Sequence, residues 1–470
     1  MTTGNMQIIW TSEQLKQALG THVDPRIRGG EIQFNSQHVK KGDIFIALKG
    51  GSSDGHDYVQ DALKNGASLA IISDQSFQFQ NNNILLVPDS LLALEKLAAF
   101  KRANSKAKFI GVTGSVGKTS TKEALKVILS AFGKTFASRG NFNNNLGIML
   151  NLASMPDDAK YAIIEMGMNH SGEIRELAHK VKPDIAIITS ISEGHLEFFS
   201  SVAEIASSKA EIFEGLSPNG SVIIPADNQY YSFLKKHAKV LGINNIYSFA
   251  ANTLADAMIN SYKIIDDRVE VYYLIKQNSV KVNLPLIAQH QALNLTICLL
   301  TAEILGCDSM TAILQFEKIK IEIGRGKIIE IVKGNKKFKV ISDYYNANPE
   351  SMKASLVYLK SITHSNKTAV LGDMLELGAN TLALHASIVS YIKTCGIKKL
   401  FLIGPNMATI ANWIDQKAIE VKIYDNAEQS INDIENSVTD DELILIKASK
   451  SMNLDKIVAC LDNSFKIISK

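Results

Sequence analysis

Glycines, a lysine and hydroxyl side chains stand together at residues 111–120, which read Gly-Val-Thr-Gly-Ser-Val-Gly-Lys-Thr-Ser. Glycines let backbone N–H groups turn toward oxygen anions, and the start of a helix adds the positive end of its dipole. Lys118 offers a point charge to outer phosphates, and the Thr119 hydroxyl is suited to Mg²⁺. The spacing is more compact than in the usual phosphate loop, which has a glycine where Val112 stands. We predict a nucleotide phosphate site formed by Thr113, Gly114, Ser115, Val116, Gly117, Lys118, Thr119 and Ser120.

The residues around this loop predict the strand and helix that such a site requires. Residues 108–113 form an apolar run typical of a buried strand. After the loop, one helical face carries Ala124, Leu125, Ile128, Leu129 and Phe132. A glycine-rich turn alone would be weak evidence, because glycines often only make turns. Strand, loop and helix together make the prediction specific.

Two further side chains follow predicted strands. Glu165 ends the apolar run at 161–166, and His195 follows the run at 184–190. Taken singly, they indicate a solvated strand end and a hydrogen-bonded structural histidine. Open α/β sheets bind ligands at the carboxyl ends of their strands, and Mg²⁺ takes few protein ligands. The joint placement of Glu165 and His195 beside a phosphate loop therefore favours a magnesium site.

Three residues are chemically suggestive, but each has an ordinary structural explanation when taken alone. Lys209 lies in a predicted helix and by itself is expected to be exposed. Asn294 shares a helix face with His290. Its side-chain amide could hydrogen-bond the edge of an adenine, or it could simply cap the helix. Arg325 stands between two glycines. Its guanidinium could donate two hydrogen bonds to a phosphate, or it could be a solvated residue of a linker.

Polar turns also end several strands in the last third of the chain. They occupy residues 343–349, 371–378 and 447–450. Each could be an ordinary solvated turn. Several such turns along one edge of a sheet indicate a lid that closes over a nucleotide and traps a substrate between domains.

Strand-like apolar runs alternate with helical stretches along most of the 470 residues. This alternation predicts α/β domains with parallel sheets covered on both faces. We expect a small α/β domain over 1–88, a central parallel-sheet nucleotide-binding domain over 89–322 and a Rossmann-like domain over 323–470. Strands are predicted at 44–48, 69–73, 161–166, 184–190, 221–226, 338–342, 368–371, 399–403, 421–424 and 442–446, helices at 59–66, 202–216 and 291–305, and a hairpin-type insertion at 269–282.

The composition is that of an ordinary globular enzyme, with 46% hydrophobic and 21% charged residues. The net charge of +3 gives no sign of a nucleic-acid surface. We expect no signal peptide, because residues 1–10 lack a basic head and apolar core, and no membrane insertion. Cys298, Cys307, Cys395 and Cys460 lack metal-ligand spacing and are expected to be buried, reduced thiols in a cytoplasmic protein.

Nearly the whole chain resembles the Mur ligase family, the ATP-dependent amide-forming enzymes of peptidoglycan precursor synthesis. The resemblance rests on the compact loop, on Asn141-Phe-Asn-Asn144, and on Glu165-Met-Gly167. It is carried further by Gly194-His195-Leu-Glu197 and by Lys209-Ala-Glu-Ile-Phe213. The segments at 343–352 and 372–378 are most similar to the MurF branch. The Asp-Asn-Pro-Arg motif of the tripeptide-forming relatives is not found.

The resemblance implies ATP and Mg²⁺ as cofactors, and UDP-N-acetylmuramoyl-tripeptide and D-alanyl-D-alanine as substrates of a monomer. It implies that the N-terminal domain holds the UDP sugar-peptide and the central domain ATP, while the C-terminal domain completes the nucleotide site and binds the dipeptide. The implied roles are catalysis for Lys118, Glu165, His195 and Lys209; metal binding for Thr119, Glu165 and His195; ATP contact for Asn294, Arg325 and Asp343; and substrate contact for Ser36, Asn346 and Asn348. Lys209 matches a lysine that some relatives carry as a carbamate.

Three family signatures are altered. Asp-Ser/Thr-Arg appears as Asn35-Ser36-Gln37, and Gly-x-His-Asn-x-x-Asn appears as 288–294 with only its histidine and last asparagine kept. Lys-Gly-Ser-Arg appears as Lys447-Ala-Ser-Lys450. Lysine does not replace arginine at a bidentate carboxylate site. The changes bear on substrate contacts more than on ATP-driven ligation.

The implied reaction has two steps. The substrate carboxylate attacks the γ-phosphate of ATP to give an acyl phosphate, which the amine of the dipeptide then attacks. Three alternatives stay open at this point. They are a ligase similar to folylpolyglutamate synthetase, a nucleotide-dependent switch or motor, and a degenerate homologue that binds without catalysis.

Overall fold

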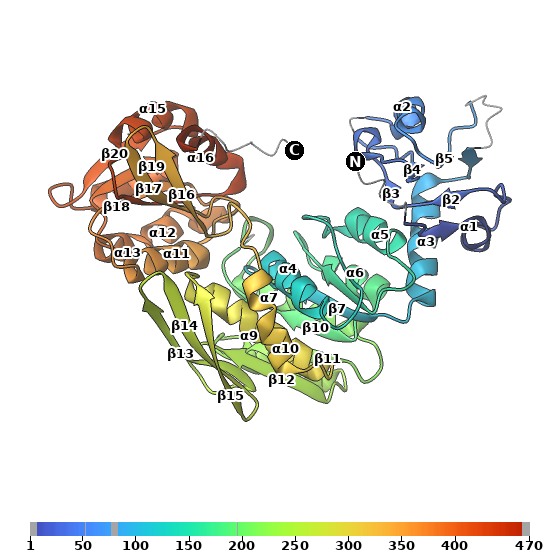
Figure 1. Cartoon of the computed structure of the whole chain (residues 1–470), viewed down its shortest axis with the longest axis horizontal. Coiled ribbons are helices and arrows are strands. Elements are labelled where there is room, and N and C mark those ends of the chain that lie inside the picture. The colour runs from blue at the N-terminus through green and yellow to red at the C-terminus, as the bar shows by residue number, and fades with distance from the viewer. Residues whose placement is uncertain (1–6, 52, 77–82, 195, 463–470) are drawn as a thin grey trace.

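The computed structural model describes residues 7–51, 53–76, 83–194 and 196–462. Across these residues the larger sheets form an N-terminal, a central and a C-terminal domain. In Figure 1 the central domain lies below, and the two outer domains stand apart above it. The fold predicted from the sequence, three α/β domains with a largely parallel central sheet, is confirmed.

The N-terminal domain is built on a small parallel sheet of order β3-β4-β5-β6, beside the antiparallel pair β1-β2. The buried strand Ile44–Ile46 lies at its centre, because all its side chains are apolar. The elements are β1 (Trp10–Thr11), α1 (Ser12–Leu19), β2 (Arg28–Gly29), β3 (Ile32–Gln33), β4 (Ile44–Ile46), α2 (Val59–Lys64), β5 (Leu69–Ile72), β6 (Ile84–Leu86) and the connecting helix α3 (Ser90–Asn104).

The central domain has a sheet of order β15-β14-β13-β12-β11-β10-β7-β9-β8. Successive side chains of its inner strands point to opposite faces. Ile164 therefore packs under α5 and α6, whereas Ile163 packs under α4 and α9. The elements up to the sixth parallel strand are β7 (Lys108–Thr113), α4 (Lys118–Leu129), β8 (Thr135–Ala137), α5 (Asn145–Ala153), β9 (Tyr161–Glu165), α6 (Glu173–Val181), β10 (Ile185–Ile188), α7 (Val202–Ala210), β11 (Ser221–Pro225), α8 (Tyr231–Val240) and β12 (Asn245–Ala250).

An antiparallel extension continues this sheet. The predicted hairpin at 269–282 is confirmed, and a preceding strand joins it, so one end of the central sheet is antiparallel rather than parallel. The alternation of buried and exposed residues along Arg268–Ile275 shows a sheet with one covered face. The elements are β13 (Ala257–Ile265), β14 (Arg268–Ile275), β15 (Asn278–Pro285), α9 (Gln289–Ile304) and α10 (Ser309–Leu314).

The C-terminal domain has a sheet of order β16-β17-β21-β18-β19-β20, parallel except at its β16 edge. Helices cover both faces, as in a Rossmann-like fold. The elements are β16 (Lys327–Lys333), β17 (Lys336–Ser342), α11 (Pro349–Ser361), β18 (Lys367–Gly372), α12 (Thr381–Ala386), α13 (Val389–Thr394), β19 (Lys399–Ile403), α14 (Pro405–Ile410), β20 (Glu420–Tyr424), α15 (Ala427–Ser437), β21 (Leu443–Lys447) and α16 (Asp455–Leu461).

The predicted elements differ from the observed ones mainly at their ends. The helix predicted at 202–216 ends at Ala210 and continues as the 3-10 turn Glu211–Gly215. Cys298, Cys307 and Cys395 are buried free thiols as predicted, whereas Cys460 is only half-buried. Within the described ranges, no helix combines the length and the apolar character needed to cross a bilayer.

Candidate nucleotide and metal site

The loop after β7 is held by the end of the neighbouring strand β10. Ser115 N donates to Ser190 O at 3.0 Å, and Val116 N donates to Ser190 Oγ at 2.9 Å. Thr189 lies so close that a side-chain carbon at Gly114 would fall 1.9 Å from its Oγ1. Gly114 also has a φ of +148°, so only glycine fits there. The predicted phosphate loop is therefore a braced structure, not a free turn.

Helix α4 begins at Lys118 directly after this loop, and no side chain caps its first turn. Its first N–H groups are thus left for an anion, at the positive end of the helix dipole. Lys118 Nζ donates to Gly114 O at 2.5 Å, which folds the ammonium back over the loop. Burial lowers the pKa of Lys118, and the Glu165 carboxylate opposes that shift. The arrangement suits a group of several negative charges.

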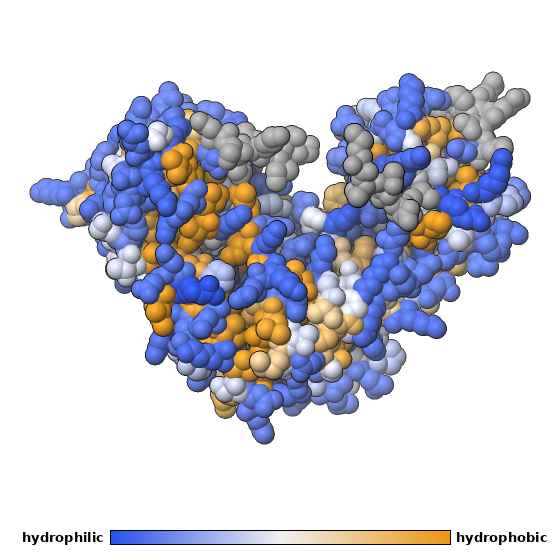
Figure 2. All heavy atoms as spheres, in the orientation of Figure 1, coloured by the Kyte–Doolittle hydropathy of each residue, from blue (hydrophilic) through white to orange (hydrophobic). Residues whose placement is uncertain are grey.

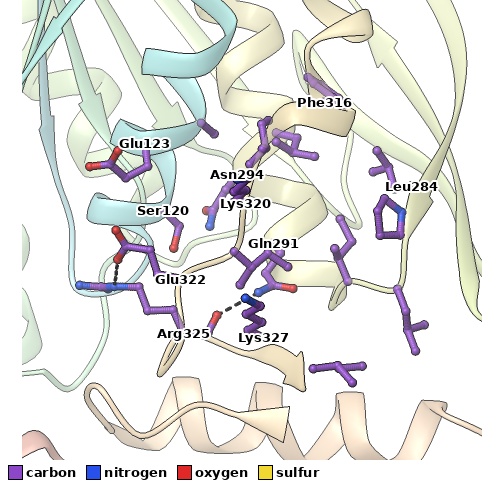
Figure 3. A pocket seen from close by; sticks show the side chains of 18 of the residues that line it. Ser120, Glu123, Leu284, Gln291, Asn294, Phe316, Lys320, Glu322, Arg325 and Lys327 are labelled. Carbon is purple, nitrogen blue, oxygen red and sulfur yellow. Dashed lines mark hydrogen bonds and ion pairs between the residues drawn. The ribbon is translucent and has the colours of Figure 1, made fainter. Parts of the chain in front are cut away.

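A cavity of about 560 Å³ opens beside this helix end, where the central and C-terminal domains meet. Figure 3 shows Ser120 and Glu123 on α4, Asn294 on α9, and Lys320, Glu322 and Arg325 on the connecting segment around it. Its apolar lining consists of Leu284, Leu286, Ile287, Leu295, Phe316, Ile319, Ile321 and Ile328. An apolar cavity with a few polar groups beside a phosphate loop has the character of a nucleoside site.

Asn294 and Arg325 both reach this cavity, so neither is the ordinary surface residue that its sequence position alone indicated. Asn294 lies against the loop, because a side-chain carbon at Gly117 would meet its Oδ1 at 2.8 Å. The Arg325 guanidinium lies over the Tyr345 ring, 3.9 Å from the centroid, and its Nε is 3.2 Å from Glu322 Oε2. Its forked donors are therefore held in place beside the cavity.

Glu165 is placed by strand pairing, since it stands opposite Val112 just before the loop. Its side chain is only 3% exposed. Oε1 accepts a hydrogen bond from Asn143 Nδ2 at 3.0 Å, whereas Oε2 is buried without a hydrogen-bond partner. A buried, unsatisfied carboxylate oxygen beside a phosphate loop fits a magnesium ligand.

Lys209 is buried, at 2% exposure, which corrects the expectation of an exposed helix lysine. Burial drives its pKa far below the usual value, and the nearby charge of Lys118 acts in the same direction. Lys209 thus belongs to the electrostatic surroundings of the phosphate loop.

The predicted metal ligand His195 falls outside the described residues. Among those that are described, no group of three or more His, Cys, Asp and Glu side chains gathers as for a metal ion.

The polar turn after β17 forms a cluster with the end of β21. Lys447 Nζ donates to Asp343 Oδ2 at 2.7 Å and to Asn346 O at 3.1 Å. Asn348 caps α11 through Oδ1, while its Nδ2 reaches Ser192 Oγ of the central domain at 3.5 Å. Asp343 and Asn348 are therefore engaged within the protein, and the exposed Asn346 has the freest side chain of the three.

Ser36 lies apart from these residues. It begins the 3-10 turn Ser36–His38 in the N-terminal domain and is 6% exposed. The preceding Asn35 caps that turn by accepting from Gln37 N. The altered signature is therefore a capped turn, and no described contact joins it to the phosphate loop.

Several residues near the site were not predicted. Lys122, on α4, is fully buried beside Glu165. Gln291 of the cavity donates to Arg325 O at 3.0 Å. Glu350, at the start of α11, lies near Ser192 of the central domain, and partial loss of hydration raises the pKa of its carboxyl. Lys122 lies one helical turn after Lys118, and this spacing could have placed it on the same helix face near the site. Its burial could not be predicted, because it depends on the loop that packs against Lys122.

Fold and site together define an α/β protein built to bind a nucleotide between domains. The family model described as the Mur ligase middle domain matches residues 112–302, and the one described as Mur ligase, glutamate ligase domain matches 329–450. A third, described as Mur ligase family, catalytic domain, matches 30–102. The chain belongs to the Mur ligase family.

Several relatives that are similar over most of this chain share one name. UDP-N-acetylmuramoyl-tripeptide--D-alanyl-D-alanine ligase of Rickettsia prowazekii (strain Madrid E) is 48% identical over 451 residues, which cover 96% of this chain and 99% of the relative. The crystal structure I of MurF from Acinetobacter baumannii has a TM-score of 0.82 at 28% identity, covering 97% and 99%. MurF ligase from Thermotoga maritima in complex with ADP has a TM-score of 0.77 at 26% identity, covering 92% and 97%.

Proposed function

We propose that this chain is an ATP-dependent ligase that joins D-alanyl-D-alanine to the terminal carboxylate of UDP-N-acetylmuramoyl-tripeptide. The products are the pentapeptide precursor of peptidoglycan, ADP and phosphate. The observation that carries the proposal is 48% identity along almost the full length of a relative with that name. The geometry supports a nucleotide site, and the similarity to that relative identifies the two substrates that are joined.

Each domain has a role in the proposal. Residues 1–88, with Ser36, bind the UDP sugar-peptide, and residues 89–322 bind ATP on the phosphate loop. Residues 323–470 close the nucleotide site with Arg325 and Asp343 and bind the dipeptide with Asn346 and Asn348. The base of ATP enters the apolar cavity near Asn294, where Phe316 and neighbouring aliphatic side chains line the wall.

In the first step the tripeptide carboxylate attacks the γ-phosphorus of ATP, the bond to the β-phosphate oxygen breaks, and ADP leaves. Lys118 and the N–H groups at the start of α4 stabilise charge on the transferring phosphoryl group. Thr119, Glu165 and His195 would hold Mg²⁺, which neutralises phosphate charge when bound. The unsatisfied Glu165 Oε2 supports this assignment.

In the second step the dipeptide amine attacks the acyl carbon, and phosphate leaves with the bonding electrons. Closure of the C-terminal domain excludes water, which would otherwise hydrolyse the acyl phosphate. Lys209, as an ammonium or as a carbamate, lies close enough to Lys118 to adjust the charge of the site. We propose a cytoplasmic monomer as the working form.

The proposal is tested by phosphate release from ATP and Mg²⁺ with UDP-N-acetylmuramoyl-tripeptide, with and without D-alanyl-D-alanine, while product mass is followed. We expect release that needs both substrates and a product heavier by one dipeptide unit. Release that needs neither would indicate a nucleotide-dependent switch. No release would indicate another acceptor or a site that binds without catalysis.

Replacing Lys118 is expected to have the largest effect on turnover. Lys118→Ala removes the ammonium that lies over the loop, so the rate of phosphate release should fall by roughly a thousandfold or more, as when a positioned charge in phosphoryl transfer is lost. Lys126→Ala, an exposed lysine two turns further along α4, is the matched control. Retained activity in Lys118→Ala would remove the proposed phosphate role.

A further inference from the structure

The ammonium group of Lys122 is buried in the central domain beside the proposed metal site. Lys122 stands four residues after Lys118, so both point from the same face of α4. Its side chain has no exposed surface. A lysine with no access to water needs partners for its three N–H donors.

Two of these donors have hydrogen-bond acceptors in the protein. Lys122 Nζ donates to Ser138 O at 2.9 Å and to Gly140 O at 3.0 Å. Glu123, which also lines the nucleotide cavity, forms an ion pair with this ammonium, with Oε1 at 3.1 Å from Nζ. The ammonium therefore ties the segment after β8 to helix α4.

Glu165 lies just outside this set of partners. Its Oε2 is 3.8 Å from Lys122 Nζ, beyond hydrogen-bond distance, and it has no hydrogen-bond partner. Lys122 thus places a positive charge near the carboxylate without occupying its free oxygen. The nearby charge stabilises a buried carboxylate, while the oxygen stays open to a cation.

The segment that Lys122 holds also positions the other atoms of Glu165. Ser138 Oγ accepts from Glu165 N at 3.1 Å, and Asn143 Nδ2 donates to Glu165 Oε1. Asn143 is itself fixed, because Gly167 N donates to its carbonyl oxygen at 2.9 Å. Lys122 therefore anchors residues 138 and 140 of the segment whose Ser138 and Asn143 hold Glu165.

We propose that Lys122 is a positioning residue for the magnesium site: it fixes residues 138–143 so that Glu165 presents Oε2 to the metal. The inference rests on the nucleotide and magnesium site proposed above. It assigns to Lys122 a role distinct from that of Lys118, because the Lys122 ammonium is fully buried and bound to protein groups, whereas the Lys118 ammonium lies over the phosphate loop.

The test is the Mg²⁺ dependence of ADP binding, measured by titration calorimetry over a range of MgCl₂ concentrations in the full-length protein. Lys122→Met keeps the length of the side chain but removes its donors. We expect the Mg²⁺ concentration that gives half-maximal tightening of ADP binding to rise about 10–100-fold, as when other residues that orient a metal ligand are lost. ADP affinity without Mg²⁺ should stay within about threefold of the wild-type value, as expected when only metal binding is affected.

Lys126→Met on the same helix is the control, and its Mg²⁺ midpoint should match the wild type. In the activity assay, kcat of Lys122→Met should recover at high Mg²⁺, which a purely structural defect would not allow. An unchanged midpoint in folded Lys122→Met would overturn the proposal. So would tighter Mg²⁺ binding, because it would mean that Lys122 acts only by repelling the cation.

A second variant decides the matter if Lys122→Met does not fold. Asn143→Ala removes the hydrogen bond to Glu165 Oε1 and leaves Lys122 in place. It should shift the Mg²⁺ midpoint in the same direction, and an unchanged midpoint would overturn the proposal.

If ADP binding by the wild-type protein does not depend on Mg²⁺, the proposed metal site is wrong, and the role of Lys122 is wrong with it. Failure of the ligase assay with D-alanyl-D-alanine would leave this titration and its interpretation intact.

Discussion

The central domain shares one large apolar core with the N-terminal domain, whereas only a few of its apolar residues pack against the core of the C-terminal domain. At the first junction Trp10 is fully buried, and its indole N–H donates to Ala153 O at 2.8 Å. Ile32 N donates to Ser154 Oγ in the same buried interface. Residues of both domains belong to a single hydrophobic cluster.

At the second junction the links are longer or more exposed. They include Asn348 to Ser192 at 3.5 Å, the backbone bond from Glu197 N to Glu376 O, and the pair of Lys339 with Asp267, which is 82% exposed. Figure 2 shows apolar residues gathered where these two domains meet, around the open nucleotide cavity. The C-terminal domain has a core on each face of its sheet, and one of these two cores also includes Ala288, with Ile264 and Leu286, of the central domain.

The difference indicates which part of the molecule turns during the proposed reaction. Separating the N-terminal domain would expose a large apolar surface and leave buried polar groups unpaired. Turning the C-terminal domain would break a few polar links and uncover a smaller apolar area, which together cost less. We expect the first two domains to act as one frame and the third to close over it.

The largest expected effect on stability comes from removing the tryptophan at the first junction. Trp10→Ala should lower the free energy of unfolding by about 3–5 kcal/mol, through lost burial and the cavity left behind. Trp413→Ala is a matched control, since that side chain is 45% exposed in the C-terminal domain and should cost about 0.5 kcal/mol or less. Urea unfolding followed by circular dichroism measures both. Equal losses would contradict the comparison.

The C-terminal domain should lose stability in acid separately from the frame. Burial lowers the pKa of His385 below 6.5, so the neutral ring stabilises the fold above pH 6.5, and that contribution is lost as pH falls toward the folded-state pKa. His385→Gln should flatten this slope. It should also cost about 1–3 kcal/mol, because Met374 N loses its buried acceptor.

The fluorescence of Trp413 in a Trp10→Phe background reports this domain alone, since the chain has only two tryptophans. Thermal unfolding is followed between pH 7.5 and pH 5 in that background. A midpoint for Trp413 that stays constant over this range, or that shifts equally in His385→Gln, would count against the assignment.

The smallest effect is expected at the exposed pair of the second junction. A double-mutant cycle on Lys339 and Asp267 should give a coupling energy below about 0.5 kcal/mol, since water screens both charges. Lys101 is only 1% exposed and lies at the first junction, where its Nζ donates to Ile9 O and pairs with Asp157 at 2.5 Å. This buried lysine should couple more strongly with its carboxylate. A stronger coupling for Lys339 and Asp267 would mean that the C-terminal domain is locked rather than free to turn.

Local patterns in the sequence were sufficient for the long apolar strands, for the compact loop and for the start of α11, whereas the strands β3, β6, β8, β12 and β16 were not predicted. The apolar run Lys108–Thr113 forms β7 as predicted, and the turn before Pro349 caps a helix. These features depend on neighbours along the chain. The loop glycines at 114 and 117 are required by close approach of Thr189 and Asn294, which spacing alone could only suggest.

Features that depend on distant residues could not be predicted. The burial of Lys209 and Lys122 follows from what packs on their helices, and the pair of Asp343 with Lys447 joins residues 104 positions apart. The extra strand β13 was missed because its exposed residues break the apolar alternation. The roles of Ser36, Lys209 and the metal ligands, including His195, stay predictions.

The shared core at the first junction also sets the order in which the protein can fold during its synthesis. The cluster that holds Trp10 also contains Leu234, so the earliest residues wait for more than two hundred others to be made. At about 5–20 residues per second this wait lasts on the order of ten seconds or more. A nascent chain thus carries an exposed tryptophan through much of translation, when chaperones would protect it, whereas the C-terminal domain completes its core soon after its last strand emerges.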